Sequence, residues 1–265
     1  MALLHVKLRK VFWKGGDEVE NWIGREKYTV EDLLEIVALL RDPEKGCAWD
    51  KVQTHESIRK NFIEETYEVA DAIDKQDAHL LCEELGDVLL QIALHTQMER
   101  ERGAFSWDDV CTGICKKLIA RHPHIFGTVK VDNPEQALHN WEQIKRAEKH
   151  RESLSVDLDD VPEALPAAVR AQKLQKRAAA HGVGITDTEG AKQALLRSVE
   201  RLQAMSEQET AEMMIGEVLF CTAGYVRLLD VDAEQALERV NTAFMQAAKK
   251  LDKAADNTLL QEESC

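Results

Sequence analysis

Five acidic side chains, spread over two consecutive stretches of the sequence, have the types and the spacing that metal chemistry requires. Within each stretch they lie three or four residues apart, which puts them on a common face of a helix. Like charges repel at this spacing, and beside a buried apolar stripe such a group must take up protons or hold a cation. The five residues are Glu64, Glu65, Glu68, Glu84 and Asp87.

The donor set narrows the choice of metal. Carboxylate oxygens select hard ions, and sites that leave positions for phosphate and water are typical of Mg²⁺ or Mn²⁺. A helical di-iron site would instead need Glu-x-x-His motifs, and no histidine of this chain has a glutamate three residues before it. A solvated acidic helix face would explain any one of these residues alone, but the paired pattern favours a metal.

Basic and aromatic residues follow at helical spacing. Lys117 and Arg121 are four residues apart, and Lys145 follows Trp141 by the same step. An isolated pair of this kind is usually only a solvated helix face. Together with a metal site, however, two cationic faces and a tryptophan suit a triphosphate whose base can stack.

The elements that must position these residues are helices, because apolar residues recur with helical periodicity. The first stripe begins at Val30 and stops at the Asp42-Pro43 pair, where proline ends a helix. A loop, Pro43–Thr54, follows it. The further helices expected from the pattern are Ile58–Lys75, Ala78–Arg102, Asp108–Ala120 and Pro134–Arg151.

The composition agrees with an all-α fold. The 265 residues include only 5 prolines and 13 glycines, 44% are hydrophobic and 31% are charged, and the prevailing Ala, Leu, Glu, Lys and Gln are good helix formers. The single β-like stretch is Val129–Val131. The length allows one large domain or two ordinary modules, each able to bury a core.

Charge and hydropathy exclude several functional classes. The formal net charge is −14 and no long basic block occurs, so we expect no nucleic-acid partner. No apolar run approaches the ~18 residues of a membrane span, and Lys7, Arg9 and Lys10 interrupt the N-terminus, so we expect neither a membrane partner nor a signal peptide. The six cysteines form no CxxC pair, which favours reduced thiols and a cytoplasmic location.

The sequence contains a weak internal repeat. Gly86–Leu90 is echoed by Gly216–Phe220, and Glu68 has a counterpart in Glu200 at a similar interval before it. This indicates two related helical modules, although two ordinary helices could agree by coincidence. The acidic, proline-containing segment Ser153–Pro166 is the candidate linker between them.

Several motifs together resemble the MazG-type nucleoside triphosphate pyrophosphohydrolases. The resemblance extends from about Tyr28 to Arg177 and more faintly to Lys250. The EExxE and ExxD pair combined with the RHPHxF string is more specific than any one part. The motifs are Arg41-Asp42-Pro43, Gly46-Cys47-Ala48-Trp49-Asp50, Gln53-Thr54, Glu64-Glu65-Thr66-Tyr67-Glu68, Glu84-Leu85-Gly86-Asp87, Arg121-His122-Pro123-His124-Ile125-Phe126 and Trp141-Glu142-Gln143-Ile144-Lys145.

The resemblance implies an all-α fold of tandem helical modules, a homodimer, and Mg²⁺-dependent hydrolysis of NTPs or dNTPs to a monophosphate and pyrophosphate. Mn²⁺ is a possible substitute for Mg²⁺. Glu64 would be the catalytic neighbour of the metal ligands, either a further ligand or the group that orients water. By position, the metal ligands would be Glu65, Glu68, Glu84 and Asp87, and the substrate-binding residues Lys117, Arg121, Trp141 and Lys145.

The second module departs from this pattern and is expected to be degenerate. Leu196-Arg197 and Met214 stand where acids are expected, and Ala243 and Ala247 stand at the basic positions. The implied organisation is an N-terminal extension at 1–27, a catalytic MazG-like module at 28–152, a linker at 153–166 and a degenerate MazG-like module at 167–265.

Two functional hypotheses follow. The first is a house-cleaning or pool-controlling pyrophosphohydrolase that acts on nucleoside triphosphates. The alternative is a regulatory protein that senses nucleotides without significant turnover. Similar helical sites also act on dUTP, dCTP or phosphoribosyl-ATP, and the choice of base would lie in loops such as Pro43–Thr54 and His122–Phe126.

Overall fold

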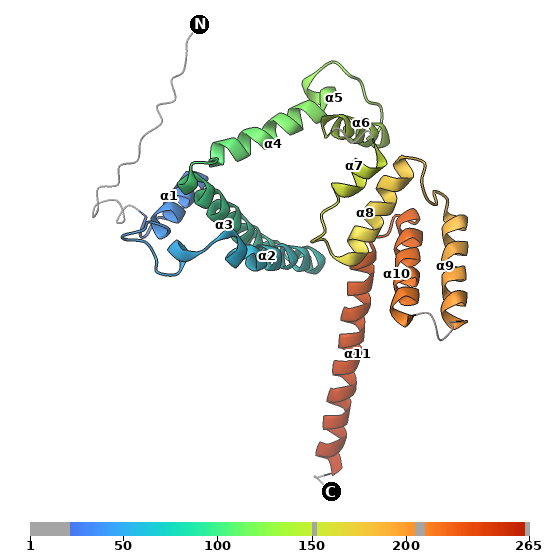
Figure 1. Ribbon diagram of the computed structural model, residues 1–265. Coiled ribbons are helices and arrows are strands. Elements are labelled where there is room, and N and C mark those ends of the chain that lie inside the picture. Colours follow the sequence, from blue (N-terminus) through green and yellow to red (C-terminus); the bar gives the residue numbers. More distant parts are fainter. Residues whose placement is uncertain (1–21, 150–152, 205–209, 263–265) are drawn as a thin grey trace. The chain divides into compact units, whose positions relative to one another are not determined.

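The computed structural model describes residues 22–149, 153–204 and 210–262, with side chains up to 252 (Figure 1). In these residues the regular structure is helical and no strand occurs, so the all-α prediction is confirmed and Val129–Val131 is not a strand. Most of the predicted N-terminal extension lies outside the described residues. The chain divides into two compact units, Met1–Val129 and Lys130–Cys265.

The first unit is built from helices whose starts are fixed by side-chain caps. Thr29, Thr54 and Ser106 each form a capping box with the residue three positions later, which satisfies backbone N–H groups that a helix start leaves unpaired. The α-helices of this unit are α1 (Val30–Leu40), α2 (His55–Lys75), α3 (Ala78–Arg102), α4 (Trp107–Arg121) and the short α5 (Pro123–Phe126).

A tight connection joins α2 to α3. Gln76 adopts a left-handed conformation with φ 55° and ends α2, and Asp77 then caps α3 by accepting hydrogen bonds from the backbone N–H groups of His79 and Leu80. Helices joined by so short a turn pack as antiparallel neighbours. The turn therefore decides which residues of α2 face which residues of α3.

A small core holds α1 against the α2–α3 hairpin. Val37 and Ile58 are each 1% exposed, and they pack with Leu94 at 3%. Helix α4 contributes no buried residue to it. The remaining members of the core are Ala93 and Met98, with Leu33, Leu34 and Leu90 packed against it.

A buried arginine fastens the loop after α1. The Arg41 side chain is 6% exposed, and its Nε and Nη2 donate to the two carboxylate oxygens of Glu101 on α3 at 2.9 and 2.8 Å. Its Nη1 donates to the backbone oxygens of Asp50 at 2.7 Å and Gln53 at 3.2 Å. One side chain thus joins the C-terminal end of α3 to the loop Pro43–Thr54.

In the second unit, α9 and α10 form a hairpin against which α8 packs. The segment predicted as a linker, Ser153–Pro166, contains a short helix, and the division between units falls earlier, after Val129. The boundaries of the modules therefore stay a prediction. The helices of this unit are α6 (Pro134–Glu148), α7 (Leu154–Asp159), α8 (Ala167–Ala180), α9 (Thr188–Gln203), α10 (Ala211–Leu228) and α11 (Ala233–Glu262).

Among the described residues, no helix combines the length and the apolar character that crossing a membrane requires.

Candidate metal centre

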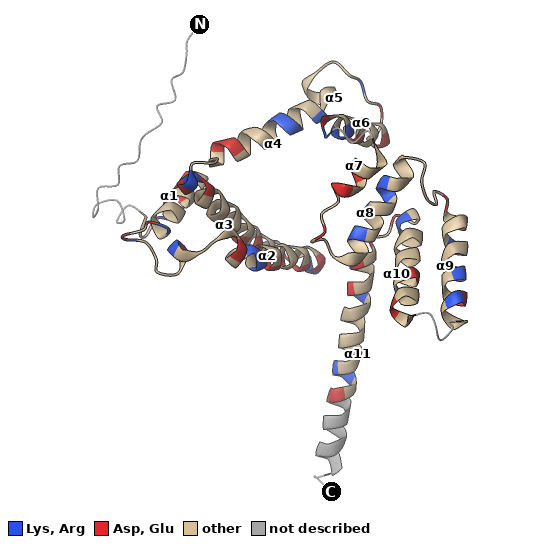
Figure 2. Cartoon of the chain, viewed as in Figure 1, with Lys and Arg blue, Asp and Glu red and all other residues tan. Residues whose placement is uncertain are grey.

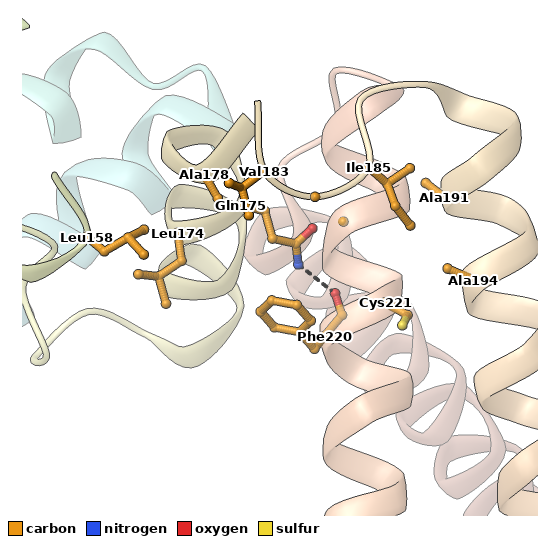
Figure 3. A pocket seen from close by; sticks show the side chains of 12 residues that line it. Leu158, Leu174, Gln175, Ala178, Val183, Ile185, Ala191, Ala194, Phe220 and Cys221 are labelled. Carbon is orange, nitrogen blue, oxygen red and sulfur yellow. Dashed lines mark hydrogen bonds between the residues drawn. The ribbon is translucent and has the colours of Figure 1, made fainter. Parts of the chain in front are cut away.

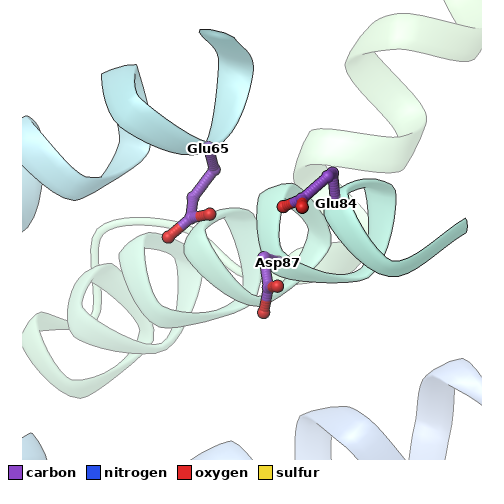
Figure 4. A group of neighbouring side chains, drawn as sticks. All are labelled: Glu65, Glu84 and Asp87. Atoms are coloured by element: carbon purple, nitrogen blue, oxygen red, sulfur yellow. The ribbon is translucent and has the colours of Figure 1, made fainter. Parts of the chain in front are cut away.

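Three carboxylates from the α2–α3 hairpin lie close to one another (Figure 4). Glu65 comes from α2 and Glu84 and Asp87 from α3, all three are half-buried, and one oxygen of each lies within 4.8 Å of the others. Opposite ligands of Mg²⁺ are about 4.2 Å apart, twice its ~2.1 Å bond to oxygen. Small side-chain movements would therefore let these oxygens share one ion.

Glu68 stands one helical turn from Glu65 and joins the same cluster. Its side chain is exposed, and its negative charge adds to the effect of burial in raising the pKa of both Glu65 and Glu84. Ionised carboxylates are acceptors alone and cannot hydrogen-bond to one another. The cluster therefore favours either a proton or a cation between its acids.

Electrostatics in the cluster oppose full ionisation. Partial burial raises the pKa of Glu65, and the nearby Glu68 carboxylate and the negative charge of Asp87 raise it further. Partial burial likewise raises the pKa of Glu84, reinforced by the charges of Glu68 and its neighbour Glu83. Such mutual repulsion is the condition that a bound divalent cation relieves.

Glu64 lies beside this cluster and outside its group of three. Its carboxylate pairs with the Lys60 ammonium at 3.1 Å, and its side chain is 52% exposed. The spacing that aligned Glu64 with Glu68 is correct for a helix, but the rotation of α2 against α3 turns Glu65 toward Glu84. The catalytic role predicted for Glu64 stays a prediction.

The predicted cations of the first unit lie on α4 (Figure 2). Helix α4 begins with Asp108 and Asp109 and carries its basic residues further along. Lys117 is exposed and Arg121 is half-buried. They are one turn apart, so both can project to the same side of the helix.

A cation not expected from the sequence lies on the same hairpin as the acids. Lys75 ends α2 and pairs with Asp71, and this contact raises the pKa of Lys75, with a smaller contribution from the charge of Glu84. In the sequence, Lys75 stands out only by its interval of four residues from Asp71, and this interval predicts no more than an ordinary ion pair on a helix surface.

In the second unit, Trp141 and Lys145 are neighbours on α6. The Lys145 ammonium lies 4.8 Å from the centroid of the Trp141 ring, which is cation–π geometry. The step of four residues thus places the pair as the sequence predicted. Their contact with a nucleotide stays a prediction.

The second unit shows no comparable cluster in its described residues. Glu217, the counterpart of Asp87, pairs with Arg201 at 2.7 Å. Met214, at the position of Glu84, is 4% exposed and fills the core. The second unit therefore has an arginine–glutamate pair and a buried methionine where the first unit has its cluster of acids.

A histidine pair at the other end of the α2–α3 hairpin was also missed. The Nδ1 atoms of His55 and His95 are 2.7 Å apart, and His55 Nε2 lies 2.6 Å from the Glu99 carboxylate. The two rings stack at 5.0 Å, and Phe62 meets His95 edge-on. Only the spacing of His95 and Glu99 on one helix face hinted at this arrangement.

The sequence of this chain matches a known protein family. Residues 53–126 match the MazG nucleotide pyrophosphohydrolase domain, a range that contains all five acids as well as Lys117 and Arg121. A nucleoside triphosphate pyrophosphohydrolase of Escherichia coli K12 is 39% identical over 229 residues, which cover 84% of this chain and 87% of that relative.

Two further relatives agree. A nucleoside triphosphate pyrophosphohydrolase/pyrophosphatase MazG of Thermotoga maritima is 38% identical over 234 residues, covering 88% of this chain and 89% of the relative. The uncharacterized protein YabN of Bacillus subtilis is 39% identical over 224 residues, covering 83% of this chain and 45% of its own length. The chain belongs to the MazG family of nucleotide pyrophosphohydrolases.

Proposed function

We propose that this protein hydrolyses nucleoside triphosphates, ribo or deoxy, to a nucleoside monophosphate and pyrophosphate with the help of Mg²⁺. The observation that carries the proposal is the convergence of Glu65, Glu84 and Asp87 within 4.8 Å from two helices. With Glu68 they would hold the ion, and Mn²⁺ could replace it because the donors are all oxygen. When bound, the ion polarises phosphate oxygens and lowers the pKa of a bound water.

The residues of the chain then divide the remaining work. Water adds to phosphorus and the bond between the α and β phosphates breaks, so pyrophosphate leaves. Glu64, beside the metal ligands, would orient the water or accept its proton. Lys117, Arg121 and Lys145 would offset charge on the reacting and leaving phosphates, and Trp141 would stack on the base.

The net charge of −14 fits this assignment. An acidic protein repels a triphosphate unless a cation inverts the local charge. The same charge argues against nucleic acid as a partner. The cysteine pattern favours a cytoplasmic location, where the protein would control or clean the nucleotide pool.

A homodimer would complete the fold. Several large apolar side chains of the first unit are exposed: Tyr67 and Leu85 of the α2–α3 hairpin at 55% and 51%, and Ile114 of α4 at 50%. Apolar surface of this kind is typical of subunit contacts. A second copy of the chain is the partner that the family resemblance implies.

The decisive experiment is a substrate panel. The full chain is incubated with ribo- and deoxynucleoside triphosphates and Mg²⁺, and products are separated by chromatography. We expect monophosphate and pyrophosphate from wild type and none from Glu65→Gln. Glu35→Gln is the matched control, since Glu35 is exposed on α1 and lies outside the group of three.

Other products would reject the proposal. Orthophosphate together with a nucleoside diphosphate would show cleavage at the wrong bond. Tight, Mg²⁺-dependent nucleotide binding without any product would instead support the alternative, a nucleotide-sensing regulator.

A further inference from the structure

The second unit contains an apolar cavity that the proposed reaction does not use (Figure 3). It lies among α8, α9 and α10 and the loop before α9, and its volume is about 420 Å³. An engineered apolar cavity of ~150 Å³ already binds benzene, and ligand pockets measure roughly 300–1,000 Å³. Its wall includes Leu174, Ile185, Ala194, Phe220, Gln175 and Cys221.

The internal repeat gives wall positions of the cavity counterparts in the first unit. Aligning Glu68 with Glu200 matches α2 to α9, and aligning Gly86 with Gly216 matches α3 to α10. This register pairs each core position of the first unit with one position of the second.

Large core residues of the first unit become small in the second. In that register Phe62 corresponds to Ala194, and Leu94 corresponds to Gly224. Leu94 is 3% exposed in the first core, and Phe62 packs edge-on against a histidine ring. Ala194 and Gly224 both line the cavity. The Gln175 amide takes the space beside Gly224, so it is at Ala194 that the cavity replaces a side chain of the other module.

Removing a buried side chain without refilling its space costs stability in proportion to the cavity left behind. The exchange of Phe62 for Ala194 therefore indicates that something else fills the space.

One polar group is built into the wall. The amide nitrogen of Gln175 donates to the backbone oxygen of Phe220 at 2.8 Å. A Cβ atom at Gly224 would come within 2.1 Å of the Gln175 amide oxygen, so the glycine is what admits this amide. A single fixed amide in an apolar wall is the kind of group that orients a small ligand.

We propose that the second unit binds a small, mostly apolar molecule carrying one hydrogen-bonding group, in the cavity walled by Ala194, Gln175 and Gly224. None of the residues lining it is charged, which disfavours a nucleotide or another anion. The site is separate from the carboxylate cluster and does not rest on the proposed reaction.

Indole is a suitable probe, because it is a bicyclic apolar molecule whose single N–H can donate to the Gln175 oxygen. The full chain is treated with a thiol reagent with and without indole, and mass spectrometry follows each cysteine. Cys221 lines the cavity, whereas the exposed Cys82 belongs to the first unit. At ten times the dissociation constant, occupancy should slow modification of Cys221 about tenfold and leave Cys82 unchanged.

A filling variant supplies the second arm. Ala194→Phe restores the residue of the first module, and we expect it to raise the melting temperature and to abolish the further rise that indole causes in wild type. Leu219→Ala is the control on α10, because Leu219 is 64% exposed and outside the cavity wall. It should keep the full response to indole.

Two results would overturn the proposal. One is unchanged Cys221 modification with both indole and 2-naphthol up to their solubility limits, which needs no variant to fold. The other is loss of self-association in Ala194→Phe, measured by analytical ultracentrifugation, while wild type ignores both probes. That second result would assign the cavity to a segment of a second copy.

Discussion

A carboxylate oxygen of Glu65 on α2 lies within 4.8 Å of one of Asp87 on α3. The two residues are brought together by the left-handed turn at Gln76, which folds the helices back on each other. The two carboxylates repel each other when both are ionised. Their proximity therefore destabilises the folded state, and a bound cation would relieve the repulsion.

Replacing Asp87 by asparagine should raise the stability of the metal-free protein and lower its activity. Without Mg²⁺, Asp87→Asn should be slightly more stable than wild type, by about 0.2–0.5 kcal/mol, because one like-charge contact is gone. Turnover should fall by more than the ~10–100-fold that loss of a supporting residue costs at metal sites. Urea unfolding and steady-state product assays measure the two effects, and a variant that is less stable yet active would contradict the metal assignment.

The raised pKa values of Glu65 and Glu84 predict opposite pH responses with and without metal. In the metal-free protein, a raised carboxyl pKa means that the folded state binds more protons. This contribution to stability is complete below the unfolded pKa and is lost as pH rises through the folded pKa. With Mg²⁺ the sign reverses, because protons compete with the ion and binding weakens as pH falls through the same window.

The difference in unfolding free energy between wild type and Glu65→Gln isolates this effect. With EDTA present, the unfolding free energy of wild type should fall relative to that of Glu65→Gln as the pH rises from about 4 to about 8. With saturating Mg²⁺, the unfolding free energy of wild type should rise relative to that of the variant over the same range. A difference that is flat under both conditions would refute the electrostatic account.

The Arg41–Glu101 pair predicts a local effect on the loop Pro43–Thr54. Glu101→Gln removes the charge that both Arg41 nitrogens contact at 2.9 and 2.8 Å, and it should cost about 1–3 kcal/mol, since a buried group loses its charged partner. Hydrogen exchange should rise in the loop, which Arg41 holds through Asp50 and Gln53. Glu44→Gln, an exposed change in the same loop, should alter neither quantity.

The helices could be predicted closely because their signals are local. Apolar periodicity and flanking caps define Ala78–Arg102, and the structure has these same bounds for α3. Helix α2 begins at His55, three residues before the expected Ile58, because Thr54 caps it ahead of the first apolar residue. Helix α6 ends at Glu148, before the predicted end at Arg151. The prediction was too long because no residue in this stretch interrupts the periodic pattern.

The site could be predicted only in part, because it depends on how two helices are rotated. Spacing alone aligns Glu64 with Glu68 as well as it aligns Glu65 with Glu68. The packing of α2 on α3 gives Glu65 to the cluster and leaves Glu64 paired with Lys60. The cavity of the second unit was likewise invisible until the repeat could be laid on a packed core.

The histidine pair provides the last prediction, an acid-labile lock between α2 and α3. Burial lowers the pKa of His95, and the charge of His55 lowers it further. The groups that face His95 are the His55 ring and the Phe62 edge, with Glu99 on the far side of His55. Since the unfolded chain protonates first, the stabilisation is complete above the unfolded pKa of 6.5 and is lost as pH falls below it.

His95→Gln tests this lock, because an amide oxygen can still accept the hydrogen bond from His55 but cannot titrate. Between about pH 8 and pH 5, wild type should lose more unfolding free energy than the variant, by up to 1.36 kcal/mol for each unit of pKa depression. His79→Gln, an exposed change in the first turn of α3, should follow wild type. Parallel curves for wild type and His95→Gln would show that His95 takes no part, because a group that does not titrate differently on folding adds no slope.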